Sequence, residues 1–209
     1  MRKFLTFCVA ALCMCAIVGC SSCNKKDKDV KPDSVSTELV VENTVSTDRE
    51  YMFTNYGEEY RWYETCVLLK EYLDEECTGS IAGISNVFQA VLEVEKGFDT
   101  KVVLFTYTPD TCAIEVKDAF WVEDFPMNDD AVKVTFKEAF DKVMAVNYPK
   151  PHSKHVVLRK QIGPKACNPQ WIFGNQHAQL YVDAVTGDVT DKNPAFGDIQ
   201  LETPLGEWP

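Results

Sequence analysis

Cysteines and histidines are the residues in this sequence with the most obvious chemical potential. The chain has nine cysteines and three histidines among its 209 residues. A thiol nucleophile needs a histidine base, and Cys167 with His177, or Cys66 with His155, would supply those two residue types. No local signature of a cysteine hydrolase surrounds either cysteine. We therefore expect a protein that is not an enzyme and has no catalytic residues, with a cysteine hydrolase as the minor alternative.

Two groups of residues could in principle hold a metal ion. His152 and His155 lie close together in "PHSKH", but they lack a third ligand nearby. Asp183, Asp188 and Asp191 are acidic, but they lack the spaced ligands and closing glutamate of an EF-hand loop. The sequence also contains neither a glycine-rich phosphate loop nor a Gly-x-Ser-x-Gly elbow. We expect no metal and no cofactor.

Composition and charge narrow the class of partner. The chain is 45% hydrophobic and 25% charged, which is typical of a globular protein. Its formal net charge is -11, with no cluster of lysine and arginine that would suit phosphate. A nucleic-acid partner is therefore not expected.

The N-terminus has the pattern of an export signal. Positive residues at positions 2 and 3 precede an apolar run at 4–18, which is too short to span a membrane. The run ends in "AIVGC", which resembles the lipobox of bacterial lipoproteins, in which a peptidase cuts before the cysteine and acyl chains are added to it. Residues 1–19 are thus predicted to be a lipoprotein signal peptide and Cys20 the lipidation site. The expected location is the bacterial cell envelope, at the outer membrane or cell surface, with the periplasmic side left open.

Residues 20–48 are predicted to be a flexible tether. The segment is rich in serine, threonine and charged residues with scattered valines, a composition that buries too little apolar surface to offset the entropy of ordering.

Residues 49–130 are predicted to form one helix followed by three strands. Tyr60, Tyr63, Val67 and Leu69 approximate a helical stripe, and a helix is therefore expected over 58–76. Three segments rich in β-branched and aromatic residues follow, separated by Gly97 and Pro109. The predicted strands are 86–94, 101–108 and 112–122.

Residues 131–209 are predicted to repeat this order and to end in a C-terminal tail. Thr135 and Glu138 have the spacing of a capping box at the start of a helix over 135–146. The predicted strands are 155–162, 170–174 and 178–189. The fold class is therefore α+β, with two tandem α-β-β-β repeats and helices packed on one face of an antiparallel sheet.

A turn is predicted inside "QLYVDAVTGDV". Leu180, Val182 and Ala184 alternate with polar residues, as expected for a half-buried strand. The turn follows this strand; Gly187 would adopt positive φ, and Asp183 would accept hydrogen bonds from backbone amides. We expect Asp183, Thr186 and Gly187 to be structural.

The second half resembles the PepSY module. The resemblance rests on Glu138-Ala139 in the helix and on the strand and turn at Val182, Asp183, Ala184, Thr186 and Gly187. The doubled arrangement also resembles PepSY-like proteins related in shape to β-lactamase inhibitor proteins. This resemblance implies an extracytoplasmic module that binds or restrains a peptidase or another partner, and no catalytic residues.

A partner-binding site is predicted on aromatic residues. If Leu180 and Val182 face the helices, Tyr181 faces away from them, and we expect it to form an exposed patch with Trp171 and Phe173. In the alternative, a loop or the C-terminal tail covers these rings.

Four cysteines remain after the signal, the lipidation site and Cys23 in the tether. Two disulfides and buried free thiols are both compatible with export, and the pairing is open. The four residues are Cys66, Cys77, Cys112 and Cys167.

Taken together, these features predict a non-catalytic envelope lipoprotein that binds a protein or peptide partner, with peptidase inhibition as one such role. It would be held on the membrane by the lipid on Cys20. The alternative is a surface lipoprotein that binds a glycan or peptide nutrient.

Overall fold

The computed structural model describes residues 38–95, 97–175 and 177–197. The predicted signal peptide, the predicted lipidation site Cys20, most of the predicted tether and the end of the predicted tail lie outside these residues. The described part of the chain contains two α-helices, nine strands and one short 3-10 helix. In chain order the elements are α1 (Val41–Tyr56), β1 (Tyr60–Leu69), β2 (Ile81–Val94), β3 (Gly97–Tyr107), β4 (Cys112–Asp118), β5 (Asp124–Phe125), η1 (Asp129–Ala131), α2 (Phe136–Ala145), β6 (His155–Gln161), β7 (Gln170–Gly174), β8 (Gln179–Asp183) and β9 (Val189–Thr190).

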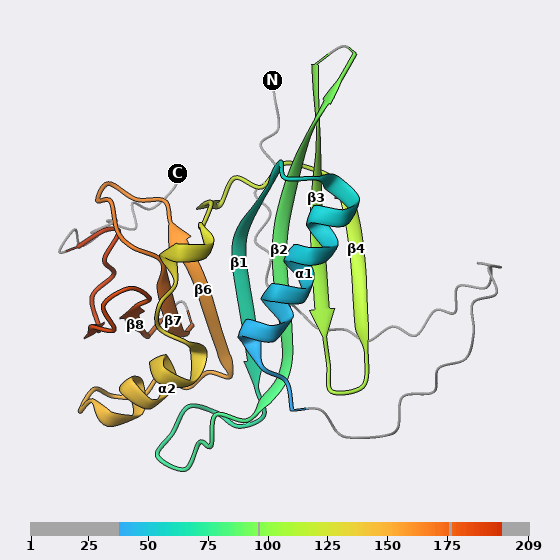
Figure 1. The fold of residues 1–209 in the computed structure, drawn as a ribbon. Coiled ribbons are helices and arrows are strands. Elements are labelled where there is room, and N and C mark those ends of the chain that lie inside the picture. The colour runs from blue at the N-terminus through green and yellow to red at the C-terminus, as the bar shows by residue number, and fades with distance from the viewer. Residues whose placement is uncertain (1–37, 96, 176, 198–209) are drawn as a thin grey trace, which may run out of the picture. The chain divides into compact units, whose positions relative to one another are not determined.

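The strands form one antiparallel sheet in the order β4-β3-β2-β1-β6-β7-β8-β9, with β5 added alongside β6. Strands β1 and β6 meet at the centre, where Val67 lies opposite Val156 and Glu64 lies opposite Arg159. Each of these two strands is followed along the chain by its outer neighbours, so the sheet grows outward in both directions (Figure 1). The α+β class and the antiparallel sheet are confirmed.

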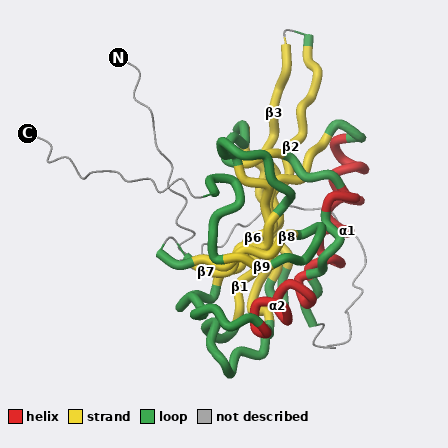
Figure 2. Tube along the Cα trace, turned by 90° about the vertical axis from the view of Figure 1, so that its left-hand side faces the viewer, coloured by secondary structure: helices red, strands yellow, loops and turns green. Residues whose placement is uncertain are grey.

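Both helices pack against the same face of this sheet. Val67 belongs to the core with Val41 and Val45 of α1, while its cross-strand partner Val156 shares that core with Phe136 of α2. Residues opposite one another in an antiparallel pair point to the same face. Connecting segments lie on the other side of the sheet from α1 (Figure 2).

The helix predicted over 58–76 is wrong, because most of this segment is strand β1. Tyr63, Thr65, Val67 and Leu69 are all buried, which is the period-two alternation of a strand. The same apolar residues also approximate a helical stripe, so the sequence pattern was ambiguous, and β-branched and aromatic side chains favour the strand. As the central strand, β1 is paired on both edges.

Residues 41–48 were predicted to belong to a flexible tether but are helical, because α1 begins at Val41. The helix buries positions 41, 44, 45, 48 and 52, a regular helical stripe. Two of these positions hold the polar residues Thr44 and Asp48. A search for regularly spaced apolar residues therefore does not detect this helix. The order of the first half is thus helix then strands, but its helix precedes the segment where it was predicted.

The second half follows the prediction closely. Thr135 caps α2, and its side chain and that of Glu138 form the expected capping box. Strands β6 and β7 occupy their predicted segments, and β8 and β9 flank the predicted turn.

The segment between β4 and α2 returns the chain from the sheet edge to its centre. Trp121 N donates to Gln89 Oε1 over 2.7 Å, and Met127 N donates to the Trp62 carbonyl over 2.7 Å. Strand β5 pairs with the end of β6. We call residues 119–131 the crossing segment.

No helix in the described part of the chain is both long and apolar enough to cross a membrane.

Candidate functional site

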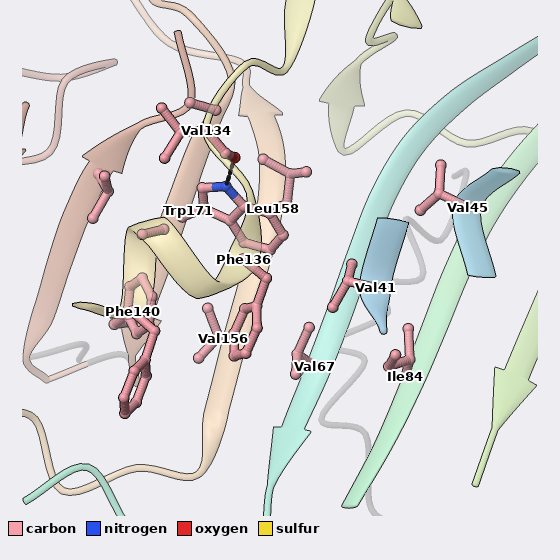
Figure 3. Packing of buried hydrophobic residues seen from close by; sticks show 14 of the residues in the cluster. Val41, Val45, Val67, Ile84, Val134, Phe136, Phe140, Val156, Leu158 and Trp171 are labelled. Atoms are coloured by element: carbon pink, nitrogen blue, oxygen red, sulfur yellow. Dashed lines mark hydrogen bonds between the residues drawn. The ribbon is translucent and has the colours of Figure 1, made fainter. Parts of the chain in front are cut away.

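The predicted aromatic patch is not exposed. Trp171, Phe173 and Tyr181 are 1%, 0% and 3% exposed, respectively. The Trp171 indole donates from Nε1 to the Val134 carbonyl over 2.9 Å, and its ring meets that of Phe136 edge to face at 5.7 Å (Figure 3). Phe173 packs toward Phe140, with ring centroids 6.5 Å apart. The expectation that these rings lie on an open sheet face is wrong, because α2 covers two of them.

Tyr181 does not share a face with the other two rings. It lies opposite Ile172 in the β7–β8 pair, whereas Trp171 and Phe173 lie opposite Val182 and Leu180. The predicted orientation of Leu180 and Val182 toward the helices is confirmed, since both belong to the core. Trp171 and Phe173 therefore face the helices too, and only Tyr181 points to the other side.

The predicted turn is confirmed. Gly187 has φ of 78°, and its amide donates to the Asp183 carbonyl over 2.8 Å. The Asp183 carboxylate accepts from the amides of Val185 and Thr186 at 2.8 and 3.0 Å. The Thr186 hydroxyl donates to Asp188 over 2.7 Å. These contacts give all three predicted residues a structural role.

Two side chains also donate hydrogen bonds to the Asp183 carboxylate. Asn168 Nδ2 donates to it at 3.0 Å, and Gln170 Nε2 at 3.3 Å. Burial alone would raise the pKa of Asp183, but the Thr186 and Val185 amides and these side chains outweigh burial and lower it. Within the described ranges, no three His, Cys, Asp or Glu side chains are grouped to hold a metal ion.

No disulfide joins any two of the four cysteines of the described ranges; Cys77 is buried, Cys66 and Cys167 are half-buried, and Cys112 is exposed. The alternative of a buried thiol therefore fits Cys77 and does not fit Cys112. Burial raises the pKa of the Cys167 thiol, partly opposed by Lys160. A raised pKa disfavours the thiolate that a nucleophile requires.

His152 stacks on Tyr72 with ring centroids 4.1 Å apart. His155 lies on the same sheet face as Cys66, one diagonal step along the β1–β6 pair.

A buried polar cluster under α1 was not anticipated from the sequence. The Tyr107 hydroxyl donates to Asp48 Oδ1, and Asn86 Nδ2 donates to Asp48 Oδ2 over 2.6 Å. Thr65 Oγ1 donates to Asn86 Oδ1 over 2.6 Å. Burial raises the pKa of Asp48 to about 6, although both hydrogen bonds to it act in the opposite direction. This cluster ties α1 to three strands and is closed to a ligand by the helix itself.

A second buried cluster lies on the opposite face, beneath the crossing segment. Arg159 Nε is 3.6 Å from Asp124 Oδ1, and the Asp124 side chain is 1% exposed. Burial, reinforced by Asp124 and opposed by Arg159, raises the pKa of Glu64 to about 7. Burial likewise raises the pKa of Asp124 to about 6, again opposed by Arg159. Two carboxyl groups here titrate close to neutral pH.

Strand β4 is the most accessible element of the sheet. All seven of its residues are exposed, and it is the last strand at one end of the sheet order. Within the residues that the structure describes, no strand pairs with its outer edge. An edge strand presents backbone N–H and C=O groups that can pair with another chain.

The side chains of β4 place Ile114 and Val116 on one face, with Asp118 at its end, and Glu115 and Lys117 on the other. Ile114 and Val116 are 43% and 47% exposed, and they lie opposite Phe105 and Val103 of the core. They therefore extend the helix-side apolar surface beyond the core. Glu115 and Lys117 occupy the other face and form an ion pair of 3.2 Å.

A cleft of about 370 Å³ opens at the C-terminal end of α1. It lies between Phe53, the start of β1 at Tyr60 to Trp62, and Met127 of the crossing segment. Glu58 and Arg61 place opposite charges in its lining. This size is within the range of small-ligand sites.

Comparison of the chain with protein-family models, with curated proteins and with solved structures gave no match.

Proposed function

We propose that this protein is a non-catalytic lipoprotein of the bacterial cell envelope that binds a protein partner by adding a strand of that partner to β4. The observation that carries this proposal is the seven-residue edge strand with every residue exposed. In strand addition, backbone hydrogen bonds supply affinity, and alternate side chains supply specificity.

The side chains of β4 suit such a partner. Ile114 and Val116 would contact apolar side chains of an added strand on the helix side, next to the core residues Val103 and Phe105. Glu115 and Lys117 would contact charged side chains on the other side. An extended segment with alternating apolar and charged residues therefore fits this edge.

The proposal includes a tandem origin of the fold and the resemblance to PepSY-like modules. The order helix and four strands occurs as α1-β1-β2-β3-β4 and again as α2-β6-β7-β8-β9. The sheet order runs outward from β1 and β6 in the same succession. These observations support two related halves joined at the centre of the sheet, with β4 and β9 as corresponding edges.

Membrane attachment through Cys20 completes the proposal. The lipobox-like "AIVGC" supports acylation, which would hold the folded part of the chain at a membrane surface. In a lysate without membranes, the folded part of the chain would no longer be held at a membrane surface.

A second candidate function is the binding of a glycan or peptide nutrient. The cleft beside Phe53, Tyr60 and Trp62 favours it, because aromatic and charged groups converge there. Saturable binding of an oligosaccharide or short peptide that Phe53→Ala abolishes and Ile114→Ala leaves unchanged would favour this function over strand addition, since Phe53 lines the cleft and is 54% exposed.

The experiment that tests strand addition places a photo-crosslinking amino acid at Ile114 of the full-length protein in living cells. Ile162 is the matched control, because it is 46% exposed, close to the 43% of Ile114. We expect a discrete adduct from position 114, isolated with the membranes, and none from position 162. The adduct should disappear when Val116→Lys is added, since lysine on an edge strand opposes pairing.

Equal adducts from both positions, or none from position 114, would contradict the proposed function. An adduct with the mass of one chain plus a different protein identifies a heterologous partner. An adduct with the mass of two chains identifies a second copy.

A further inference from the structure

We propose that the strand that adds to β4 is β4 of a second copy of this chain, paired antiparallel about Val116. This inference rests on the proposed strand addition and names its partner. Its starting observation is that Ile114 and Val116 lie on one face of β4 and the oppositely charged Glu115 and Lys117 on the other.

Symmetry makes the arrangement geometrically simple. Two identical strands that pair antiparallel are related by a twofold axis, and the same patch is used on both copies. Residues opposite one another share a sheet face. With Val116 opposite itself, α1 of each copy lies on the same side, and the two sheets become continuous through the β4–β4 pair.

Charge selects the register. Pairing about Val116 places Glu115 opposite Lys117 of the second copy, and Lys117 opposite Glu115 of the second copy. Pairing about Glu115 would instead place two carboxylates opposite each other. Opposite charges stabilise a cross-strand pair and like charges destabilise it, so the Val116 register is favoured.

The apolar side chains fit the same register. Val116 would contact Val116 of the second copy, with Ile114 of each copy at the diagonal positions, within reach of the pair. Ile114 would lie directly opposite Asp118 of the second copy, and the Asp118 carboxylate is paired with Lys101 of its own chain. In a single copy, Ile114 is 43% exposed and Val116 is 47% exposed. Pairing would cover them and join the two helix-side cores.

Attachment to a membrane would help a contact of this size. A single pair of short strands gives a small interface, which favours weak association. Copies anchored through Cys20 would share one membrane surface, and confinement raises their effective concentration without any new contact.

Disulfide cross-linking tests the register in the full-length, lipidated protein in membranes. The background carries Cys23→Ser and Cys112→Ser, and oxidation of this background alone gives the baseline. Residues directly opposite lie about 4.5–5.5 Å apart at Cα, within disulfide range, whereas diagonal neighbours lie about 7–8 Å apart. We expect Val116→Cys to give about tenfold more covalent dimer than Glu115→Cys, because only Val116 is opposite itself.

Charge exchange tests the pairing independently. Glu115→Lys should weaken dimer formation in detergent by about tenfold, because both cross-strand pairs become repulsive. The double variant Glu115→Lys/Lys117→Glu should restore dimer formation, because the cross-strand pairs are again of opposite charge. Mixing the single variants Glu115→Lys and Lys117→Glu should restore it for the same reason. All should melt like the unaltered protein, since both residues are exposed.

The outcomes separate this inference from the proposed function. Equal cross-linking at positions 115 and 116, or a charge exchange without effect, would overturn the Val116 register. A chain that stays monomeric but forms an Ile114-dependent adduct with another protein would overturn self-pairing and leave strand addition standing. A chain that stays monomeric and forms no adduct from position 114 would overturn both self-pairing and strand addition.

Discussion

The Tyr107 hydroxyl donates a hydrogen bond to the buried carboxylate of Asp48 and so joins the middle of α1 to strand β3. Asn86 donates to the same carboxylate from β2. Through this one side chain the helix is fixed above the strands that lead to β4.

Asp48→Ala should therefore lower the free energy of unfolding by about 2 kcal/mol or more, because it leaves buried donors of Tyr107 and Asn86 without their acceptor. Asp48→Asn keeps an oxygen at this position and should cost less. Urea denaturation of the three proteins measures the difference. Equal stability of Asp48→Ala and the unaltered protein would contradict the proposed importance of this cluster.

The buried carboxyls should make the protein less stable as pH rises through neutrality. The folded-state pKa is about 7 for Glu64 and about 6 for Asp124, both above their ordinary values of 4.5 and 3.8. A raised pKa means that the folded state binds the proton more tightly, so this stabilisation is full below about pH 4 and is lost as pH rises through about 7.

Denaturation midpoints at pH 5 and pH 8 test this effect. We expect a lower midpoint at pH 8, and a smaller difference in Glu64→Gln/Asp124→Asn. The remaining dependence should include Asp48, whose pKa is about 6. A double variant with the full dependence of the unaltered protein would show that these two carboxyls are not its source.

Trp171→Ala should destabilise the fold by about 3–5 kcal/mol, the usual range for a large buried aromatic. Trp171 is 1% exposed, in contact with Phe136 and hydrogen-bonded to Val134. Phe120→Ala is the control, because Phe120 is 61% exposed and should change stability by about 0.5 kcal/mol or less. Similar melting temperatures for the two variants would contradict the packing of α2 on β7.

Gly187→Val should cost about 1 kcal/mol or more, because valine is strained at a φ of 78°. An added Cβ would also lie 2.7 Å from Lys142 Cε. Gly57→Val is the control for backbone strain alone, since Gly57 has φ of 74° and no atom within 4 Å of an added Cβ. Adding Lys142→Ala should rescue part of the loss at Gly187 and none at Gly57.

Cys20→Ala should abolish lipidation and leave an uncleaved precursor. Metabolic labelling with a fatty-acid analogue, followed by membrane fractionation, measures both effects. Cys23→Ala is the control and should be labelled normally. A mature, labelled product from Cys20→Ala would contradict the lipoprotein assignment.

The sequence predicted those elements whose signals are local. The capping box of Thr135 and Glu138 marked the start of α2, and the glycine at 187 marked the turn after β8. The alternation of Leu180 and Val182 also predicted correctly which side chains face the helices.

The rest depended on contacts between distant residues. Asp48 is buried on α1 only because Asn86 and Tyr107 satisfy its carboxylate, and no local pattern records those partners. The face of Trp171 follows from the β7–β8 register, which the sequence did not specify. The accessibility of β4 likewise required the strand order of the whole sheet.

Hydrogen–deuterium exchange at residues 112–118 tests strand addition most directly. The full-length protein is compared in its native membranes and as a dilute preparation in detergent, with the buried strand β7 as internal reference. Backbone amides on the outer edge of β4 gain hydrogen bonds when a strand is added. Slower exchange across β4 in the membranes, with β7 unchanged, is the predicted result; equal exchange of β4 in both preparations would contradict the account.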